Sequence, residues 1–354
     1  MTLNFFVELE GQRVKEKILK MLKESSPAYI SGEEMAGKLQ TSRTSVWKNI
    51  KLLQKSGYSV QGSSRRGYRL VETPDLLYPA EISEGLLTEI VAKSPEVIHH
   101  FMQVDSTNNC LKLLAEEGAP EGTVVVAEEQ TAGKGRLGRS WSSPRGKGIV
   151  FSVLLRPPKP LEEISIFTLL TAVAVTRAVR KKLPGIDAGI KWPNDILVKG
   201  RKICGILTEL KAEADRLHYL VVGIGLNFNH TSDDFPTELK KSATSIFLEN
   251  DGRHTDRKET TREILREMDS MYREYLTMGA EGILEQWKDL NITLGRKITI
   301  KSLRESFAGS ALDVDKYGAL IVAGPGGERK RFVTGEITTQ EFKTRDRDKS
   351  PSKL

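Results

Sequence analysis

The segment KWPNDILVKGRKICGILTEL, residues 191–210, predicts two β-strands joined by a tight turn. The apolar runs ILV and ICGIL lie on either side of KGR, and a glycine between charged residues is typical of a hairpin turn. A proline-fixed turn precedes the first strand and places Asn194 and Asp195 at its start. The segment therefore predicts a sheet whose hairpin end carries an amide, a carboxylate and two lysines, Lys191 and Lys202.

Apolar patterns on both sides of this hairpin extend the predicted sheet. Further stretches are rich in β-branched residues, as expected for strands: GTVVVAEEQ (122–130), GIVFSVLLRP (148–157) and LHYLVVGIGLN (217–227). Longer stretches have helical spacing: SIFTLLTAVAVTRAVRKKL (165–183) and RKETTREILREMDSMYREYLTMG (257–279). Strands and helices mix without strict alternation, so we expect an α+β fold with one mixed sheet over residues 82–286.

Short strands and turns dominate the sequence after this region. Short apolar stretches alternate with the turns DKYG and GPGG: RKITIKS (296–302), SALDVD (310–315), GALIVAG (318–324) and RKRFVTGEI (329–337). We expect residues 287–338 to form a small β-barrel. The charged, apolar-poor end, residues 339–354, is expected to be a disordered tail.

The first part of the chain has the pattern of a winged helix-turn-helix. RVKEKILKMLKE (13–24) and SRTSVWKNIKLLQKSG (42–57) place apolar residues at helical spacing, and SGEEMAGKL (31–39) begins with a capping box. YSVQGSSRRGYRL (58–70) alternates apolar and polar residues around a polar tip, which predicts a β-hairpin. We therefore expect a DNA-binding domain over residues 11–73, followed by a proline-punctuated linker.

Charge supports DNA binding by this domain. The chain carries a formal net charge of +7, and residues 35–71 contain several Lys and Arg but no Asp or Glu. A localised basic face is the electrostatic footprint of a protein that binds a polyanion. The expected DNA contacts lie at the start of the second helix of the pair and at the hairpin tip: Arg43, Thr44, Ser45, Lys48, Arg65 and Arg66. The alternative is a small helical scaffold with an ordinary solvated lysine face.

Composition argues against several other classes of protein. The first residues lack a basic segment and carry Glu8 and Glu10, unlike a signal peptide. The most apolar run, IFTLLTAVAV (166–175), is too short to span a bilayer, so no membrane partner is expected. Cys110 and Cys204 have no metal-ligand spacing, so we expect free thiols in a reducing compartment, the cytoplasm.

The loop EQTAGKGRLGRSW, residues 129–141, has the composition of an anion site. Its cations alternate with glycines, which let backbone N–H groups approach an oxyanion closely: Lys134, Arg136 and Arg139 with Gly133, Gly135 and Gly138. The residues that follow are typical of a loop, so we expect a mobile flap over the anion and not a helix N-terminus beneath it. Trp141 either covers an apolar ligand or anchors the flap to the core.

The polar residues of the hairpin allow more than one interpretation. Asn194 and Asp195 beside Lys191 suit a Mg²⁺ ion or an amine, although PND alone is common as a turn cap. Lys202 at the mouth of an apolar tunnel suits a carboxylate on an apolar tail, although a lysine there is also common on an edge strand. We find no nucleophile with a partnered base. Several cations without a nucleophile suit a reaction between two bound anions, such as attack of a carboxylate on the α-phosphate of ATP.

The polar motifs occur in an order that resembles a known family. DSTNN (105–109), EQTAGKGRLGRSW, KWPNDILVKGRKICGILTEL and GIGLN (223–227), behind a winged helix-turn-helix, resemble the bacterial bifunctional biotin–protein ligases that also repress the biotin operon. The resemblance implies a ligase domain of the biotin/lipoate type and an SH3-like C-terminal barrel. The flap of the family usually reads GRGRRGR, so this chain departs from it at Lys134 and Leu137.

The resemblance also implies roles for individual residues. Those expected to hold biotin are Ser106, Thr107, Asn108, Gln130, Lys134, Gly135, Arg136 and Lys202. Those expected to hold ATP or the adenylate are Gly133, Arg139, Trp141, Asn194 and Asn227. Those expected to act in the reaction are Lys191, Asp195, Lys202 and Arg136, the last by retaining the adenylate.

The implied reaction has two steps and a regulatory outcome. Biotin and ATP with Mg²⁺ form biotinyl-5′-AMP and release pyrophosphate, and a lysine of a biotin carboxyl carrier protein, such as that of acetyl-CoA carboxylase, then takes the biotin and releases AMP. The adenylate-bound form is expected to dimerise and to bind operator DNA of biotin synthesis genes. The alternatives are a transcription regulator that only senses its ligand, and a lipoate ligase on a related fold.

Overall fold

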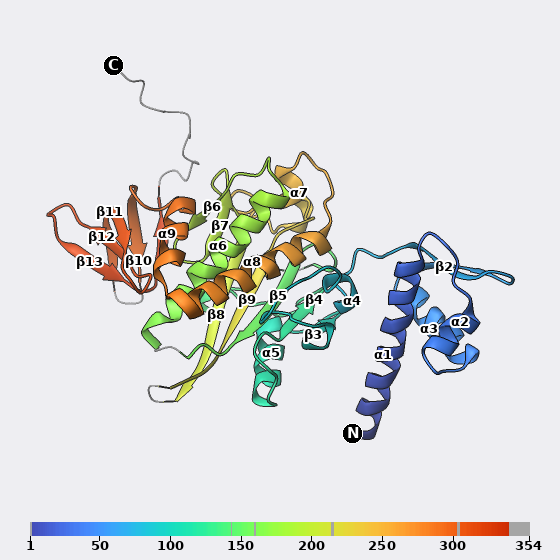
Figure 1. Cartoon of the computed structure of the whole chain (residues 1–354). Helices are drawn as coiled ribbons and strands as arrows, with labels where there is room; N and C mark the ends of the chain where they lie inside the picture. Colours follow the sequence, from blue (N-terminus) through green and yellow to red (C-terminus); the bar gives the residue numbers. More distant parts are fainter. Residues whose placement is uncertain (1, 143, 159–160, 214–215, 303–304, 340–354) are drawn as a thin grey trace, which may run out of the picture. The chain divides into compact units, whose positions relative to one another are not determined.

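The computed structural model describes residues 2–142, 144–158, 161–213, 216–302 and 305–339, with the backbone alone for 2–13. The chain divides into two compact units, Met1–Leu76 and Leu77–Leu354 (Figure 1). The boundary falls inside the linker expected from the sequence. The expected tail falls almost entirely outside the described residues.

The first unit is a winged helix-turn-helix. Its elements are α1 (Thr2–Ser25), α2 (Gly32–Lys38), α3 (Arg43–Lys55), β1 (Ser59–Ser63) and β2 (Gly67–Glu72). Ser31 and Ser42 cap α2 and α3, because their side chains accept from the backbone N–H groups of Glu34 and Ser45. The strands pair antiparallel, so the helix-turn-helix and hairpin predictions are confirmed.

Apolar residues at helical spacing form the core of this unit. Ile18 and Leu22 of α1 pack against Val46, Ile50 and Leu53 of α3. Each of these residues is at most 1% exposed. Burial of this stripe leaves the opposite face of α3 to solvent, including Arg43, Thr44 and Lys48. The amphipathic pattern therefore both folds the unit and exposes its basic helix.

A seven-stranded mixed sheet forms the centre of the second unit. The strand order is β3-β4-β5-β9-β8-β7-β6, and only β3 and β4 run parallel. The strands are β3 (Ile98–Phe101), β4 (Val124–Ala127), β5 (Ile149–Leu155), β6 (Ala188–Lys191), β7 (Asp195–Val198), β8 (Arg201–Glu213) and β9 (Arg216–Leu226). The prediction of one mixed sheet with a hairpin at KGR is confirmed.

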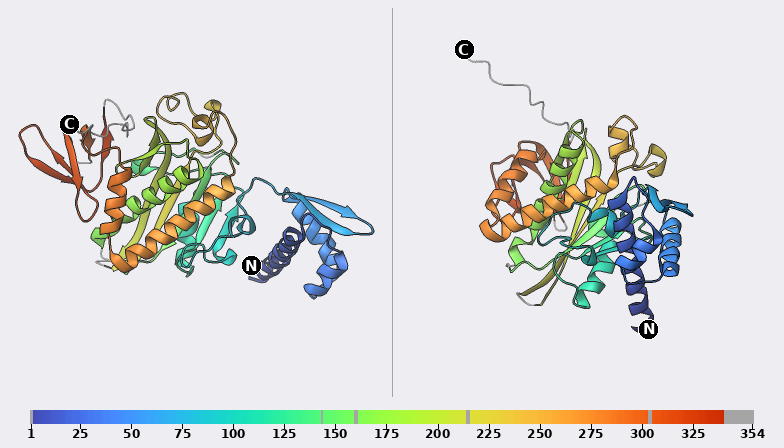
Figure 2. Two further views of the ribbon diagram at one scale, coloured as in Figure 1. Left: turned by 45° about the horizontal axis from the view of Figure 1, so that its top comes forward. Right: turned by 45° about the vertical axis from the view of Figure 1, so that its right-hand side comes forward.

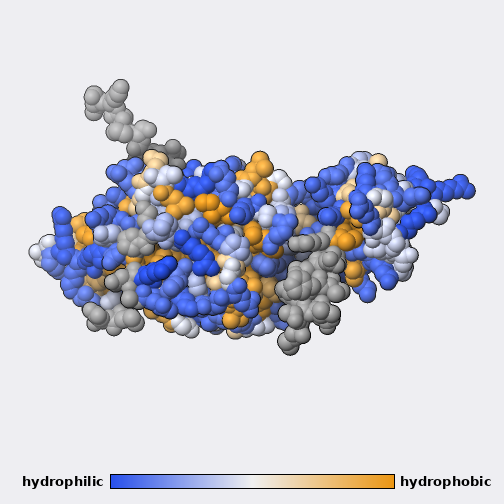
Figure 3. All heavy atoms as spheres, turned by 60° about the horizontal axis from the view of Figure 1, so that its bottom comes forward, coloured by the Kyte–Doolittle hydropathy of each residue, from blue (hydrophilic) through white to orange (hydrophobic). Residues whose placement is uncertain are grey.

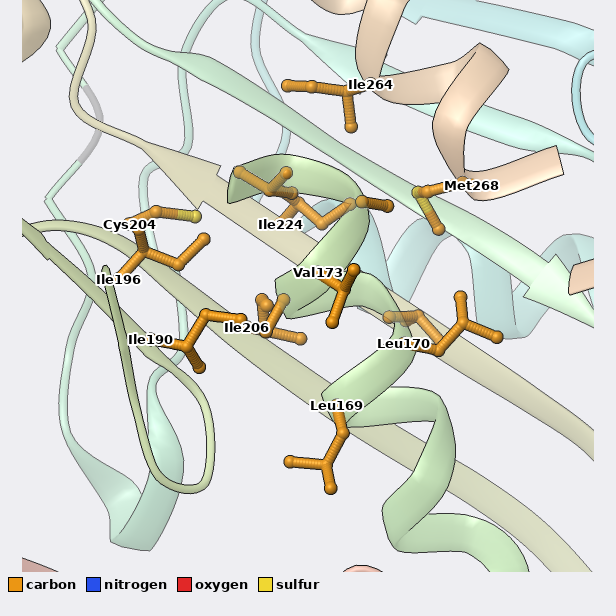
Figure 4. Close-up of a cluster of buried hydrophobic side chains, with 14 of the residues drawn as sticks. Leu169, Leu170, Val173, Ile190, Ile196, Cys204, Ile206, Ile224, Ile264 and Met268 are labelled. Carbon is orange, nitrogen blue, oxygen red and sulfur yellow. The ribbon is translucent and has the colours of Figure 1, made fainter. Parts of the chain in front are cut away.

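Helices cover the two faces of the sheet unequally. They are α4 (Pro79–Ile82), α5 (Thr107–Glu116), α6 (Ile164–Lys182), α7 (Ile246–Glu249), α8 (Arg257–Met278) and α9 (Glu281–Leu290). α6 and α8 lie side by side across one face (Figure 2). Their side chains, such as Leu170, Val173 and Met268, pack on Ile206 and Ile224 of the sheet (Figure 4). This apolar layer fixes that face of the sheet.

The opposite face carries α5 and the polar site. Along β4, Val124 and Val126 join the α6–α8 core, whereas Val125 packs under α5. The same alternation on β9 puts Val221 under α5 and therefore places Gly223 and Gly225 on that face. Strand periodicity thus leaves a row of positions without side chains beside α5.

A second sheet follows α9. It has five antiparallel strands in the order β13-β12-β11-β10-β14: β10 (Lys297–Lys301), β11 (Ser306–Val314), β12 (Leu320–Ala323), β13 (Arg329–Phe332) and β14 (Glu336–Thr338). Within the described residues β13 and β14 are edge strands, so a closed SH3-like barrel is not confirmed. This sheet packs in the same compact unit, since Trp192 Nε1 donates to Gly318 O at 3.0 Å.

A buried ion pair joins the start of the second unit to its centre. Glu128 and Arg257 have fully buried side chains 2.9 Å apart. Glu128 Oε1 accepts from the backbone N–H of Leu77 at 2.7 Å and lies 3.3 Å from His100 Nε2. Burial opposes ionisation of Glu128, but these partners outweigh it and lower the pKa of the carboxyl group. Arg257 also donates to Gly148 O, just beyond the flap.

No helix among the described residues is long and apolar enough to cross a bilayer. On the face shown in Figure 3, hydrophobic residues lie in scattered groups among hydrophilic ones. Cys204 is buried and Cys110 is half-buried, and both are free thiols, as expected.

Candidate active site

A first pocket lies on the α5 face of the large sheet. Its wall combines the start of α5, the flap and the middle of β8 and β9. The lining residues are Ser106, Thr107, Asn108, Gln130, Lys134, Gly135, Arg136, Trp141, Val150, Asn194, Lys202, Gly205, Ile206, Leu207, Gly223, Ile224 and Gly225. All residues that the resemblance assigned to biotin are therefore brought together.

Buried hydrogen bonds hold the polar end of this pocket. Gln130 Oε1 accepts from the backbone N–H of Thr107 at 2.8 Å and lies 3.0 Å from Thr107 Oγ1. Asn108 reaches across the sheet: its Oδ1 lies 2.6 Å from Ser152 Oγ, and its Nδ2 donates to Glu209 at 2.7 Å. Both Thr107 and Asn108 are nearly inaccessible to solvent.

Glycines form the floor of the pocket because side chains from other elements lie directly on them. A Cβ at Gly223 would lie 2.2 Å from Asn108 Oδ1, and a Cβ at Gly225 would lie 2.5 Å from Trp141 Cε2. Gly205 pairs with Gly225 in the sheet and also faces Trp141. Glycine within a strand marks such a close approach. Trp141 thus both anchors the flap and lines the pocket.

A second pocket continues from the first toward the C-terminal sheet. Its lining includes Lys191, Asp195, Asn227 and Phe235, as well as Glu336 of β14. Several residues line both pockets: Gly135, Arg136, Trp141, Asn194 and Lys202. The two pockets are therefore one continuous site with cations where they meet.

The cations at the junction are already paired. Lys202 Nζ lies 2.6 Å from Asp195 Oδ1, and Arg136 Nη1 donates to Asn194 Oδ1 at 2.7 Å. Burial lowers the pKa of Lys191, although the nearby Asp195 opposes this shift. Positive charge held in a partly buried site attracts anionic ligands.

The flap contacts the C-terminal sheet. Arg136 Nη2 donates to Thr334 Oγ1 and, at 3.4 Å, to Gly335 O, and Arg139 pairs with Glu336. Residues about 200 positions apart in the sequence thus close one wall of the second pocket. This contact was not expected from the sequence.

The structure shows where the two departures from the family pattern lie in the flap. Leu137 has φ 56°, in the left-handed region, and its side chain is 56% exposed. Lys134 Nζ donates to Asn109 Oδ1 at 2.9 Å, at the start of α5. Leu137 therefore lies at an exposed turn of the flap, and Lys134 connects the flap to α5.

The sequence-based site assignments can be located residue by residue. Of the residues expected to hold nucleotide, Arg139, Trp141, Asn194 and Asn227 line the second pocket. Gly133 lines neither pocket but lies at the foot of the flap, where a Cβ would meet Gln130 Nε2 at 2.7 Å. The expected catalytic residues lie at or near the junction: Lys191, Asp195, Lys202 and Arg136. No trio of His, Cys, Asp or Glu among the described residues could hold a metal ion.

The expected DNA contacts lie together in the first unit. Ser45 is half-buried, and the other five side chains are exposed: Arg43, Thr44, Lys48, Arg65 and Arg66. Arg66 lies over the Tyr29 ring, with its guanidinium carbon 4.3 Å from the ring centroid. Stacking of this kind limits the motion of an arginine at the hairpin tip.

Several site residues were missed in the sequence. Ser152 stands within an apolar strand, and Glu209 looks like a surface carboxylate at the end of another. Glycines at alternating positions of one strand, Gly223 and Gly225, were the available signal for a close approach. No local signal could link Thr334 to the flap.

Family models match the chain in three places. The Biotin/lipoate A/B protein ligase family matches residues 100–227. An HTH domain matches residues 14–69, and the Biotin protein ligase C terminal domain matches residues 293–338. The three matches fall on the first unit, the large sheet and the C-terminal sheet.

Whole proteins are similar over most of the chain. The bifunctional ligase/repressor BirA of Bacillus spizizenii is 40% identical over 90% of this chain and 97% of its own length. The protein of the same name from Escherichia coli is 28% identical over 93% and 98%. Among solved structures, a biotin protein ligase from Aquifex aeolicus in complex with biotin and ATP has a TM-score of 0.60, with 29% identity over 68% of this chain and 97% of its own.

Proposed function

This chain belongs to the family of bifunctional biotin ligase/repressors, and on that premise we propose that it biotinylates a carrier protein using ATP and represses transcription through its first unit. The observation that carries the proposal is the continuous site, in which a polar pocket and a second, larger recess meet at Arg136, Asn194 and Lys202. A carboxylic acid in one and a nucleotide in the other would meet at these cations.

The junction suits formation of an acyl adenylate. Biotin would bind with its ring at Thr107 and Gln130 and its carboxylate toward Lys202. ATP would bind in the second pocket with its α-phosphate at the same lysine. Attack of a carboxylate on a phosphate brings two negative charges together, so Lys202 and Arg136 would act by neutralising charge and fixing the geometry. Arg136, tied to the C-terminal sheet, would then retain the adenylate.

Magnesium fits this site only together with the nucleotide. Two carboxylates line the second pocket, and both are engaged: Asp195 Oδ1 lies 2.6 Å from Lys202 Nζ, and Glu336 pairs with Arg139. Two carboxylates that already pair with cations do not provide the oxygen cage that Mg²⁺ requires from protein alone. We therefore propose that Mg²⁺ enters with the ATP phosphates and that Asp195 lies near them.

The second step needs a nucleophile from another protein. The ε-amine of a lysine on a biotin carboxyl carrier protein would attack the adenylate and release AMP. Asp195 lies at the junction with 22% of its side chain accessible to solvent, where it could orient that amine. This part of the proposal rests on the family and on the position of Asp195.

The first unit would bind operator DNA. The exposed start of α3 suits the major groove, and the arginines of the hairpin suit the phosphate backbone. We propose that the adenylate-bound protein dimerises, which would present two such units to a two-fold symmetric site. We propose that the protein acts in the cytoplasm, where a bacterial protein has access to both ATP and DNA.

The ligase proposal is tested with the purified full chain. Biotin, MgATP and a carrier domain should yield biotinylated carrier, and biotin should stimulate exchange of pyrophosphate into ATP. Folded protein without exchange would instead indicate a regulator that only senses ligand. Lipoate in place of biotin provides the matched control, because a lipoate ligase would reverse the preference.

The DNA proposal is tested by footprinting on DNA of the source genome, with and without biotin and ATP. Affinity should fall steeply with salt, and loss of one phosphate-contacting arginine should reduce the slope of log K against log salt by about one. Arg65→Ala and Arg66→Ala test the hairpin tip. An affinity that does not depend on salt would contradict the proposed contacts.

A further inference from the structure

A tryptophan lies half-exposed on the basic face of α3. The side chain of Trp47 is 50% exposed, although tryptophan is highly buried on average. Trp47 follows Arg43 by one helical turn and Thr44 by three residues, so these side chains are neighbours on the surface of the helix. Lys51 lies one turn further, with its Nζ 5.9 Å from the centre of the Trp47 ring. An apolar ring therefore lies among the polar and basic groups of this face.

The position of Trp47 on α3 directs its ring toward the hairpin side of the first unit. The α3 residues that form the core lie on the other side of the helix. Gln54 lies two turns after Trp47 on the same side, and its Nε2 donates to Val60 O of β1 at 2.8 Å. This side of α3 therefore faces the hairpin. The ring lies where the helix and the hairpin would both approach DNA.

The chemistry of the ring decides which part of DNA it can meet. Residues 35–71 contain no Asp or Glu, so the cations of this face attract the phosphates. Of the indole, only Nε1–H could bond a phosphate, whereas its carbon surface needs an apolar partner. The base edges in the major groove present donors and acceptors together with one apolar group, the 5-methyl group of thymine. An indole that enters this groove therefore pairs best with a thymine methyl group.

We propose that Trp47 is a specificity-determining residue, whose ring contacts the 5-methyl group of a thymine in the major groove of the operator. The assignment rests on the proposed function, in which the first unit binds operator DNA. Trp47 was not among the DNA contacts expected from the sequence. The cations of α3 and the hairpin then position the protein on DNA of any sequence, and the ring distinguishes thymine from cytosine.

The test removes single methyl groups from the DNA. The full chain, with biotin and ATP, is bound to the footprinted operator, in which each thymine in turn is replaced by deoxyuracil. This replacement removes only the methyl group and keeps the base pair. For the wild-type protein, one such replacement in each half-site should weaken binding by about four-fold, the size of one buried methyl group. If no thymine shows this effect, the assignment is wrong.

Three variants show whether the ring is the partner of the methyl group. Trp47→Ala should weaken binding to the thymine operator by about four-fold or more, and it should then bind the thymine and deoxyuracil operators equally. Its salt dependence should match the wild type, because no phosphate contact is lost. Trp47→Lys adds a cation and should raise affinity for any DNA without restoring the methyl effect. Leu52→Ala is the matched control, since Leu52 is an apolar α3 residue that is 47% exposed and five residues away from Trp47. It should keep the four-fold effect.

Two results would overturn the role of Trp47 and leave DNA binding in place. A deoxyuracil effect that persists in Trp47→Ala would arise from the shape of the DNA and not from contact with the ring. A salt slope that falls by about one in Trp47→Ala would place the indole on a phosphate. A folded wild-type chain that protects no DNA would overturn the proposed DNA binding and this assignment together.

Discussion

The two pockets of the site are built in different ways. The polar end of the first is held by side chains that are nearly inaccessible, such as Thr107, Asn108 and Ser152. The wall of the second is closed by Arg139 and Glu336, whose side chains are 68% and 34% exposed. Exposed ion pairs contribute little stability, whereas a filled buried hydrogen-bond network is rigid. One pocket is therefore preformed, and the other has a wall that opens at low cost.

This difference suggests a division of labour. A small acid meets a surface that is already complementary, so changes in the first pocket should alter affinity and specificity. A nucleotide and its product must enter and leave past the flap, so changes in the second should alter retention. The residues at the junction belong to both pockets and should alter both properties.

The largest expected effect comes from the junction. Lys202→Ala removes the charge that both pockets share, so we expect biotin-dependent pyrophosphate exchange to fall by about 1,000-fold. Lys199→Ala is the control. Lys199 lies in the KGR turn just before Lys202, pairs with Glu249 and has a side chain that is 74% exposed. If the rate of pyrophosphate exchange by Lys202→Ala lies within ten-fold of the rate of Lys199→Ala, Lys202 does not take part in the reaction.

A smaller effect is expected at the flap. Arg136→Gly should still form the adenylate but release it about 100-fold faster, because the contacts to Asn194 and the C-terminal sheet are lost together. The measurement is labelling of a bystander protein, relative to the carrier. Arg145→Gly changes an exposed arginine of the same loop that lines neither pocket. Labelling confined to the carrier in both variants would contradict the retention role.

A substitution in the glycine floor of the first pocket tests the junction between the two pockets. Gly225→Ala would place a methyl group 2.5 Å from Trp141 Cε2 and so displace the indole. We expect KM to rise about ten-fold for both biotin and ATP, with a loss of about 1–3 kcal/mol in stability. Gly185→Ala is the control, since nothing lies within 4 Å of a Cβ there. A rise in KM for one ligand alone would show that Trp141 serves one pocket.

The smallest expected effect comes from the C-terminal sheet. Thr334→Ala removes one acceptor of Arg136, which should increase the rate of adenylate release by about three-fold. Val333→Ala is the control, because Val333 is the exposed neighbour of Thr334 in the sequence. Biotin affinity should not change in either variant, and a change would mean that the two pockets are less independent than their construction implies.

Local patterns in the sequence predicted much of this arrangement. Helical spacing identified the core of the first unit, and the apolar runs on either side of KGR identified the hairpin that follows Asn194 and carries Lys202. Both signals are local, since each needs only the residues of one or two neighbouring elements. The motifs of the family then grouped distant residues such as Thr107 and Gln130, which the structure joins directly.

The remainder depends on packing between distant elements. Ser152 is a strand residue whose role appears only when α5 lies over β5, and Glu209 acquires its partner from the same helix. The C-terminal strands were predicted, but closure of a barrel depends on pairing between edges that the sequence pattern does not specify. For the same reason, the contact of Thr334 with Arg136 had no local signal.

The buried pair of Glu128 and Arg257 determines where the chain can be shortened. Glu128 Oε1 accepts from the backbone N–H of Leu77, the first residue of the second unit. A fragment that starts a few residues before Leu77 keeps this donor, whereas one that starts at Pro79 leaves a buried carboxylate with one partner fewer. Loss of such a donor costs about 1–3 kcal/mol. The shorter fragment should therefore melt at a lower temperature, although it retains every residue of both pockets.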